Sequence, residues 1–258
     1  MKIIAELVKN KIIISGNIVE VYEYEKGYLK DFTINSNGNG GRVADYTSDN
    51  YEEHRKQALK RAKRDLRRLI NANIDMYGDD IVCKFMTLTF SENITDLKAA
   101  NYEWEKFIKR LNYEVFNTKK SNLRYNVVIE FQKRGAIHYH AIFYNLPYIR
   151  QKRLLEIWGN SLILDIRKIE DIDNVGAYIS EYLGDPEKEQ GKKESDNRLQ
   201  GKKSYFSSRG LFKPVEITDK KKVEALAQAL PVEKKVFNAH FSNEHLGQIS
   251  YTQYNLIK

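Results

Sequence analysis

Short stretches of alternating hydrophobic and polar residues recur along the chain, and each predicts a β-strand. Residues 11–34 are rich in β-branched residues and contain Lys26-Gly27, so they predict an N-terminal β-hairpin that turns at this dipeptide. Residues 81–90 (IVCKFMTLTF) predict a strand on which Phe85 and Thr87 share one face.

Two further strands are predicted at 124–132 and 136–144, and a fourth at 161–169. The first two are separated by Lys133-Arg134-Gly135, a three-residue loop ending in glycine that suits a hairpin with a bulge. These two strands are therefore expected to be antiparallel neighbours.

Apolar residues spaced three and four apart predict helices between these strands. Thr95 and Asp96 suit the start of one helix, and Asp173 suits the cap of another that ends at Gly184 and Pro186. The predicted helices cover 51–70, 95–111, 147–159 and 173–184.

The resulting order from 81 to 185, β-α-β-β-α-β-α, predicts an α+β fold with an antiparallel central sheet and helices on one side. Before this core, residues 1–80 form the N-terminal hairpin and a basic helix. After it, residues 186–258 form a basic segment and a C-terminal extension packed on the core. That extension is expected to contain a short helix at 218–230 and an edge hairpin.

The composition narrows the class of protein. The chain has 258 residues, 41% of them hydrophobic, which predicts a globular rather than a disordered protein. Its one cysteine, Cys83, allows no intramolecular disulfide and no cysteine-rich zinc site, which favours a reducing compartment. The first residues, MKIIAELVKNK, lack the apolar core of a signal peptide, and no apolar run has the length of a membrane span. We therefore expect a soluble, cytoplasmic protein without a membrane partner.

Two segments account for the whole net charge of +8, and the rest of the chain is close to neutral. Residues 51–70 hold eight Lys or Arg and three acids, and residues 186–213 hold eight and four. Clustered positive charge on a near-neutral body predicts a polyanionic partner, most commonly nucleic acid. A solvated charged helix is the alternative. The side chains expected to contact DNA are Arg61, Arg64, Arg67, Arg68, Lys202, Lys203 and Arg209.

Two histidines stand out in the stretch GAIHYHAIFY. His138 and His140 lie two residues apart on a predicted strand, so both imidazoles project from one face. If the hairpin turns at Lys133 to Gly135, Glu130 lies directly opposite His138, and the three side chains could hold Mg²⁺ or Mn²⁺. A two-residue turn would instead place Glu130 beside Tyr139 and break this site. Two hydrogen-bonded histidines on a half-buried strand are the other alternative.

The last predicted helix carries two tyrosines one turn apart, Tyr178 and Tyr182. They could simply pack against the sheet. Alternatively, one could attack a phosphodiester, because a phenol with a pKa of about 10 becomes a useful nucleophile when a metal ion polarises the phosphate. A covalent phosphotyrosine would conserve the energy of the broken bond for later rejoining.

Three short motifs in this order resemble those of the HUH endonuclease superfamily, in particular rolling-circle replication initiators of plasmids, phages and mobile elements. They are FMTLTF (85–90), HYHAIF (138–143) and AYISEYL (177–183). The basic segment 198–214 also resembles the one that follows the tyrosine helix in initiators of Gram-positive plasmids. The resemblance covers about 81–185 and implies a ferredoxin-like core.

The resemblance implies a role for each of these side chains. His138, His140 and Glu130 would bind the divalent ion, Tyr178 would attack the scissile phosphate to leave a 5′-phosphotyrosine, and Tyr182 would match the second tyrosine of two-tyrosine members. Glu181 departs from the motif, which usually has lysine there, and Asp185 stands where some members have a second lysine. If that lysine holds a phosphate, its role is absent here or passes to Lys202, Lys203 or Arg209.

The function expected from the sequence is a DNA endonuclease and strand transferase that initiates rolling-circle replication. Its partners would be single-stranded and duplex origin DNA, with a host helicase and polymerase. A relaxase or a single-strand transposase would use the same chemistry, whereas a hydrolytic nuclease would form no covalent adduct. A non-catalytic nucleic-acid-binding protein is the alternative from a different class, since an antiparallel sheet with helices also suits RNA-binding modules.

Overall fold

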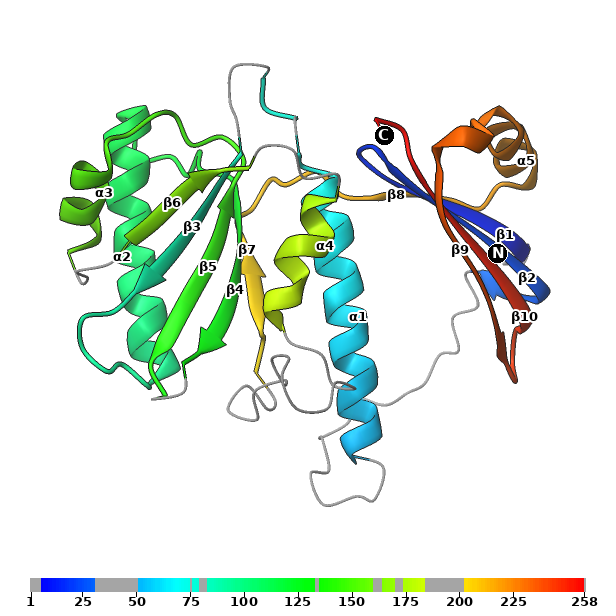
Figure 1. The fold of residues 1–258 in the computed structure, drawn as a ribbon, viewed down its shortest axis with the longest axis horizontal. Coiled ribbons are helices and arrows are strands. Elements are labelled where there is room, and N and C mark those ends of the chain that lie inside the picture. Colours follow the sequence, from blue (N-terminus) through cyan, green and yellow to red (C-terminus); the bar gives the residue numbers. More distant parts are fainter. Residues whose placement is uncertain are drawn as a thin grey trace, which may run out of the picture. The chain divides into compact units, whose positions relative to one another are not determined.

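The computed structural model describes residues 6–30, 51–74, 76–78, 83–132, 135–159, 164–169, 174–183 and 202–257. The chain forms two compact units, which are described separately: Met1–Ser48 with Lys213–Lys258, and Asp49–Phe212. Each unit contains a five-stranded antiparallel sheet (Figure 1). This arrangement confirms the predicted α+β class. Among the described helices, none combines the length and the apolar composition needed to cross a membrane.

The sheet of the Asp49–Phe212 unit has the strand order β6-β3-β5-β4-β7. Its strands are β3 (Lys84–Thr89), β4 (Tyr125–Phe131), β5 (Ile137–Phe143), β6 (Leu164–Lys168) and β7 (Tyr205–Ser207). β5 lies at the centre, between β3 and β4. The register pairs Glu130 with His138, as the three-residue hairpin turn predicts. The alternative pairing of Glu130 with Tyr139 is therefore wrong.

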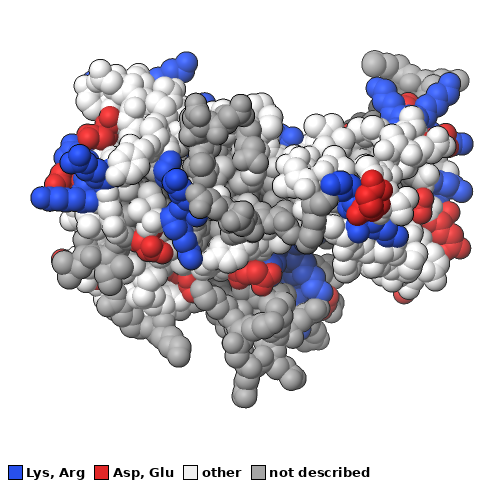
Figure 2. Space-filling view, turned by 45° about the horizontal axis from the view of Figure 1, so that its top comes forward, with Lys and Arg blue, Asp and Glu red and all other residues white. Residues whose placement is uncertain are grey.

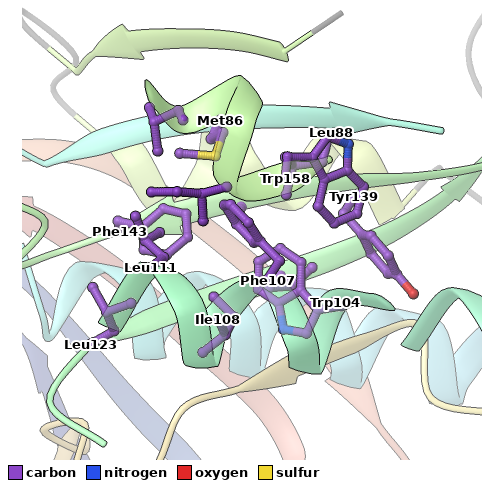
Figure 3. Close-up of a cluster of buried hydrophobic side chains, with 14 of the residues drawn as sticks. Met86, Leu88, Trp104, Phe107, Ile108, Leu111, Leu123, Tyr139, Phe143 and Trp158 are labelled. Carbon is purple, nitrogen blue, oxygen red and sulfur yellow. The ribbon is translucent and has the colours of Figure 1, made fainter. Parts of the chain in front are cut away.

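One face of this sheet carries the larger hydrophobic core. Helices α2 (Leu97–Phe116) and α3 (Gln151–Trp158) cover it, and their aromatic side chains meet those of the strands (Figure 3). Asp96 caps α2 by accepting a hydrogen bond from the Ala99 amide, as predicted. Helix α3 ends at Gly159 as predicted but begins at Gln151, later than Pro147 suggests.

Helices also cover the opposite face, so the prediction of helices on one side is wrong. Helix α1 (Tyr51–Asn71), helix α4 (Val175–Ser180) and the 3₁₀ turn η1 (Glu181–Leu183) pack there. A second core joins them to the sheet, because side chains of α1 and α4 contact those of β3, β4 and β5. Its buried members are Leu66, Ile70, Cys83, Phe85, Val128, Ile142, Tyr144, Val175, Ile179 and Leu183.

The position of α4 depends on a close approach to α1. A Cβ atom on Gly176 would lie 2.6 Å from Oδ1 of Asn71, so only glycine fits there. The Asn71 Oδ1 accepts a 2.8 Å hydrogen bond from the Gly176 amide, and its Nδ2 donates to Asn174, which caps α4. Asn174 therefore occupies the N-cap position that the sequence predicts for Asp173. Asp173 and the predicted helix end at Gly184–Pro186 lie outside the described residues.

The other unit pairs the two ends of the chain in one sheet, with the order β8-β1-β2-β10-β9. Its strands are β1 (Glu6–Ser15), β2 (Ile18–Lys30), β8 (Val215–Ile217), β9 (Lys235–Asn243) and β10 (Gly247–Asn255). Helix α5 (Lys220–Ala229), followed by the 3₁₀ turn η3 (Val232–Lys234), contributes Val223 to a small core with Ile12, Val19 and Val21. The short helix and the C-terminal hairpin are therefore as predicted.

Two expectations about this unit need correction. The first hairpin turns at Gly16-Asn17, where Gly16 has a φ of 59°, and Gly27 instead lies in an irregular part of β2. The C-terminal hairpin, expected on the core at 81–185, adds its strand β10 to β2. The chain consequently divides differently from the three segments expected, since α1 belongs to the unit that carries the motifs.

Candidate functional site

The two histidines lie on β5, on the face that α1 and α4 cover. His140 pairs with Thr87 of β3 and with Val128 of β4, whereas His138 pairs with Thr89 and Glu130. Since paired residues project to the same side, the three predicted metal ligands share this face. The His140 side chain is 7% exposed and that of Glu130 is 21% exposed.

Both ring nitrogens of His140 have partners. Its Nε2 contacts the Oε2 of Glu130, and its Nδ1 lies 3.2 Å from Oγ1 of Thr87. Glu130 therefore bonds to its diagonal neighbour His140, although His138 is the residue opposite it in the ladder. The rings of His138 and His140 are 6.3 Å apart.

Tyr182 stacks directly on His140, with 4.1 Å between ring centroids and 27° between the planes. The hydroxyl groups of Tyr178 and Tyr182 are 3.4 Å apart, and the two rings are nearly perpendicular. Phe85 contacts both tyrosines and stacks on His140 at 5.9 Å. The structure thus brings the histidine strand and the tyrosine helix together in one aromatic cluster.

The two tyrosines differ in their surroundings. The Tyr178 side chain is exposed, whereas Tyr182 is half-buried. Burial raises the pKa of Tyr182 to about 12, and the adjacent Tyr178 hydroxyl adds to this shift. The hydroxyl of Tyr182 therefore stays protonated at neutral pH.

The donor atoms at this site suit a divalent ion. Two imidazoles and one carboxylate on neighbouring strands can ligate a divalent ion and leave positions open for the oxygen ligands that Mg²⁺ and Mn²⁺ prefer. Among the described residues, however, no group of three or more His, Cys, Asp or Glu side chains is arranged as a metal site. The Glu130 carboxylate and the His140 imidazole bond to each other instead, while His138 lies on the same face.

A positive charge that the sequence reading missed lies beside the tyrosines. Arg167, on the edge strand β6, pairs with Phe85, and its Cζ is 5.2 Å from the centre of that ring. The positive charge of Arg167 opposes the rise in the pKa of Tyr182. Only the pairing of β6 with β3 brings Arg167 here, and no local sequence signal gives that register.

Glu181, at the expected lysine position, points toward α1. Its Oε1 lies 3.1 Å from Nζ of Lys63, so the two form an ion pair. Lys63 of α1 thus offsets the charge of Glu181, while Arg167 of β6 acts on the Tyr182 hydroxyl.

The predicted DNA-contact residues fall into three places in this unit. Arg61 and Arg64 are exposed on α1, whereas Arg67 and Arg68 are half-buried. Lys202 and Lys203 are exposed just before β7, at the end of β4 that carries Glu130, because Ser204 accepts a hydrogen bond from Ile129. Arg209 is exposed near the opposite end of β7, beside Tyr125. On the face drawn in Figure 2, basic side chains form several separate groups with acidic ones beside them.

Part of this unit is similar to a known family. Residues 83–187 match the family model for the replication-associated protein ORF2. The matched range contains both histidines, Glu130 and both tyrosines, so this part of the chain is similar to replication-associated proteins. No curated protein and no solved structure matches the chain.

Proposed function

We propose that the protein initiates rolling-circle replication by nicking and rejoining single-stranded origin DNA through a 5′-phosphotyrosine. The observation that carries this proposal is the stacking of Tyr182 on His140, with the Tyr178 hydroxyl 3.4 Å from that of Tyr182. This juxtaposition lies inside the range that matches a replication-associated family. Two tyrosines packed only as core would not need a half-buried Glu–His pair beneath them.

Tyr178 is the proposed nucleophile, because its side chain is exposed and DNA can reach it, whereas Tyr182 is half-buried. Its oxygen would attack the scissile phosphorus as the bond from phosphorus to the 3′ oxygen breaks. The phenolic proton passes to water, and the leaving 3′ oxygen takes up a proton. The products are a 5′-phosphotyrosine and a free 3′-hydroxyl for a polymerase. Tyr182 would serve the second transfer, once the Tyr178 hydroxyl is esterified.

His138, His140 and Glu130 would hold Mg²⁺ or Mn²⁺. Such an ion, when bound, would withdraw charge from the scissile phosphate. Thr87 would orient His140, because an Nδ1–H donating to its hydroxyl leaves the Nε2 lone pair available to a metal ion. Arg167 would hold the phosphate in place of the missing motif lysine, since a guanidinium binds phosphate oxygens in pairs.

The basic side chains would hold the DNA around this site. Lys202 and Lys203 lie at the Glu130 end of the sheet and are proposed to contact the single strand. The α1 residues Arg61, Arg64, Arg67 and Arg68, together with Arg209, are proposed to contact phosphates of the flanking duplex. We also propose a host helicase and polymerase as partners, and the cytoplasm as the location.

A covalent-adduct assay tests the proposal. Labelled single-stranded oligonucleotides that tile the DNA around the coding sequence are incubated with the protein and Mn²⁺, then separated on a denaturing gel. We expect a protein–DNA band that Tyr178→Phe abolishes and that Tyr182→Phe retains. His140→Ala should abolish the band while leaving salt-sensitive DNA binding intact.

Other outcomes assign other functions. An adduct lost only in Tyr182→Phe would exchange the roles of the two tyrosines. Cleavage without any adduct would indicate hydrolysis, and DNA binding without cleavage would indicate a non-catalytic protein. Adducts formed only at transposon ends or at a transfer origin would indicate a transposase or a relaxase.

A further inference from the structure

Strand β9 forms one edge of the sheet in the unit that joins the two chain ends. Side chains on both of its faces reach solvent: Val236 is 41% exposed, Phe237 54% and Phe241 46%. The ladder with β10 is regular from Phe237 to Asn243, with an irregularity at Val236. A long edge strand with exposed apolar side chains tends to pair with another strand.

The sequence of β9 is complementary to itself around Ala239. When two copies run antiparallel with Ala239 facing Ala239, each Phe237 lies opposite Phe241 of the other copy, and each Asn238 lies opposite His240. The small alanine at the twofold axis leaves room between the two phenylalanine pairs. Aromatic cross-strand pairs of this kind stabilise sheets.

Charges at the two ends of β9 favour the same arrangement. Lys234 and Lys235 lie at its start, and Glu244 directly follows its end. Antiparallel pairing about Ala239 brings the basic end of one copy to the acidic end of the other, whereas parallel pairing would bring like charges together. If the twofold axis moved by one residue to His240, His240 would lie opposite itself. If it moved to Asn238, Phe237 would lie opposite Ala239. Either shift would lose both aromatic pairs.

We propose that two copies of the chain associate through β9, antiparallel about Ala239, so that one continuous sheet runs through both copies. The strand that pairs with the β9 edge is therefore β9 of a second copy of the chain. The proposal is independent of the chemistry at the tyrosines. Because one strand edge buries less than the roughly 800 Å² per partner of a standard interface, we expect a dissociation constant in the micromolar range.

Cysteine cross-linking tests the register. Cys83 is buried and is the only cysteine, so the unmodified chain serves as the background control. Facing residues in an antiparallel pair have Cα atoms about 4.5–5.5 Å apart, within the range of a disulfide. Under mild oxidation we expect Ala239→Cys to form a disulfide-linked dimer by itself. Asn238→Cys and His240→Cys should cross-link when mixed, and poorly when each is alone.

Sedimentation equilibrium tests the association. The chain of 30.2 kDa should approach twice this mass as its concentration rises. Phe237→Lys puts a charge into both aromatic pairs and should weaken the dimer at least tenfold. Val232→Lys is the matched control, because Val232 is 81% exposed and lies before the strand, and it should leave the dimer unchanged. Circular dichroism checks that both variants remain folded.

Four results would overturn the proposal. The first is a chain that stays monomeric throughout the micromolar range. The second is a dimer that persists in Phe237→Lys, and the third is cross-linking of Asn238→Cys alone as efficient as that of Ala239→Cys. A monomer that loses single-stranded DNA binding in Phe237→Lys would also overturn it, and would make β9 a base-stacking surface instead.

Discussion

Replacing Gly176 with alanine should disturb the helix that carries both tyrosines. The new Cβ would lie 2.6 Å from Oδ1 of Asn71 and 2.9 Å from its Cγ, and closer still to the carbonyl oxygen of Arg67. Carbon contacts are normally about 3.5 Å or longer. Helix α4 must therefore retreat from α1 by about 1 Å to clear the Arg67 carbonyl, and the Asn71 side chain must shift as well.

Either movement breaks the hydrogen bond from the Gly176 amide to Asn71, which is 2.8 Å long. It also disturbs the bond from Asn71 to Asn174, which caps α4. Overpacking of this kind lowers the free energy of unfolding by about 1–3 kcal/mol. Tyr178 lies two residues from the clash, and a displacement of a reacting group by about 1 Å can lower a rate 100-fold.

Urea unfolding and the rate of adduct formation measure the two effects of Gly176→Ala. The control is Glu181→Ala at the exposed end of the same segment, which loses only its ion pair with Lys63. That change should alter the free energy of unfolding by less than about 1 kcal/mol. If Gly176→Ala unfolds and reacts like the unmodified protein, α4 is not held against α1 at this point, and the argument fails.

Three further changes test single contacts at the site. Thr87→Val removes the hydroxyl next to the His140 imidazole, and should reduce adduct formation at limiting Mn²⁺ about 10- to 100-fold. Arg167→Gln should slow adduct formation at saturating Mn²⁺ at least about tenfold, with Lys168→Gln as its unaffected neighbour. Burial raises the pKa of Tyr182 from 10.0 to about 12, so the folded chain keeps a proton that the unfolded chain releases. Stability should therefore fall between pH 10 and 12 by more in the unmodified protein than in Tyr182→Phe, as urea midpoints at each pH would show.

The sequence predicts the local features of the site well. The glycine-ended loop between β4 and β5 fixes the hairpin register, and with it the shared face of Glu130, His138 and His140. Strand alternation and the Asp96 cap likewise depend on neighbouring residues, so they can be predicted without knowledge of the whole fold. The bond of Glu130 to His140 depends on side-chain rotamers, which the sequence does not give, so this bond could not be predicted.

Local sequence patterns do not predict which distant segments contact each other. The register of β6 against β3 brings Arg167 to Phe85, and the pairing of β10 with β2 joins the two ends of the chain. Both depend on long-range pairing that alternation alone leaves open. The coverage of both sheet faces is a related case, because the apolar stripe of α1 predicts burial but does not say against which surface.

The sequence predicts helix α4 from a local pattern, but its position depends on contacts with distant segments. With six residues from Val175 to Ser180, it is too short to be stable by itself, so its position must come from the contacts with α1 and the sheet. Arg67 illustrates the consequence: its side chain is a candidate DNA contact, yet its backbone carbonyl borders Gly176. Substitutions on α1 can therefore lower activity by weakening DNA binding or by moving Tyr178. The salt dependence of binding separates these effects, since removing a phosphate contact lowers its logarithmic slope by about 0.7–0.9, whereas moving the tyrosine leaves that slope unchanged.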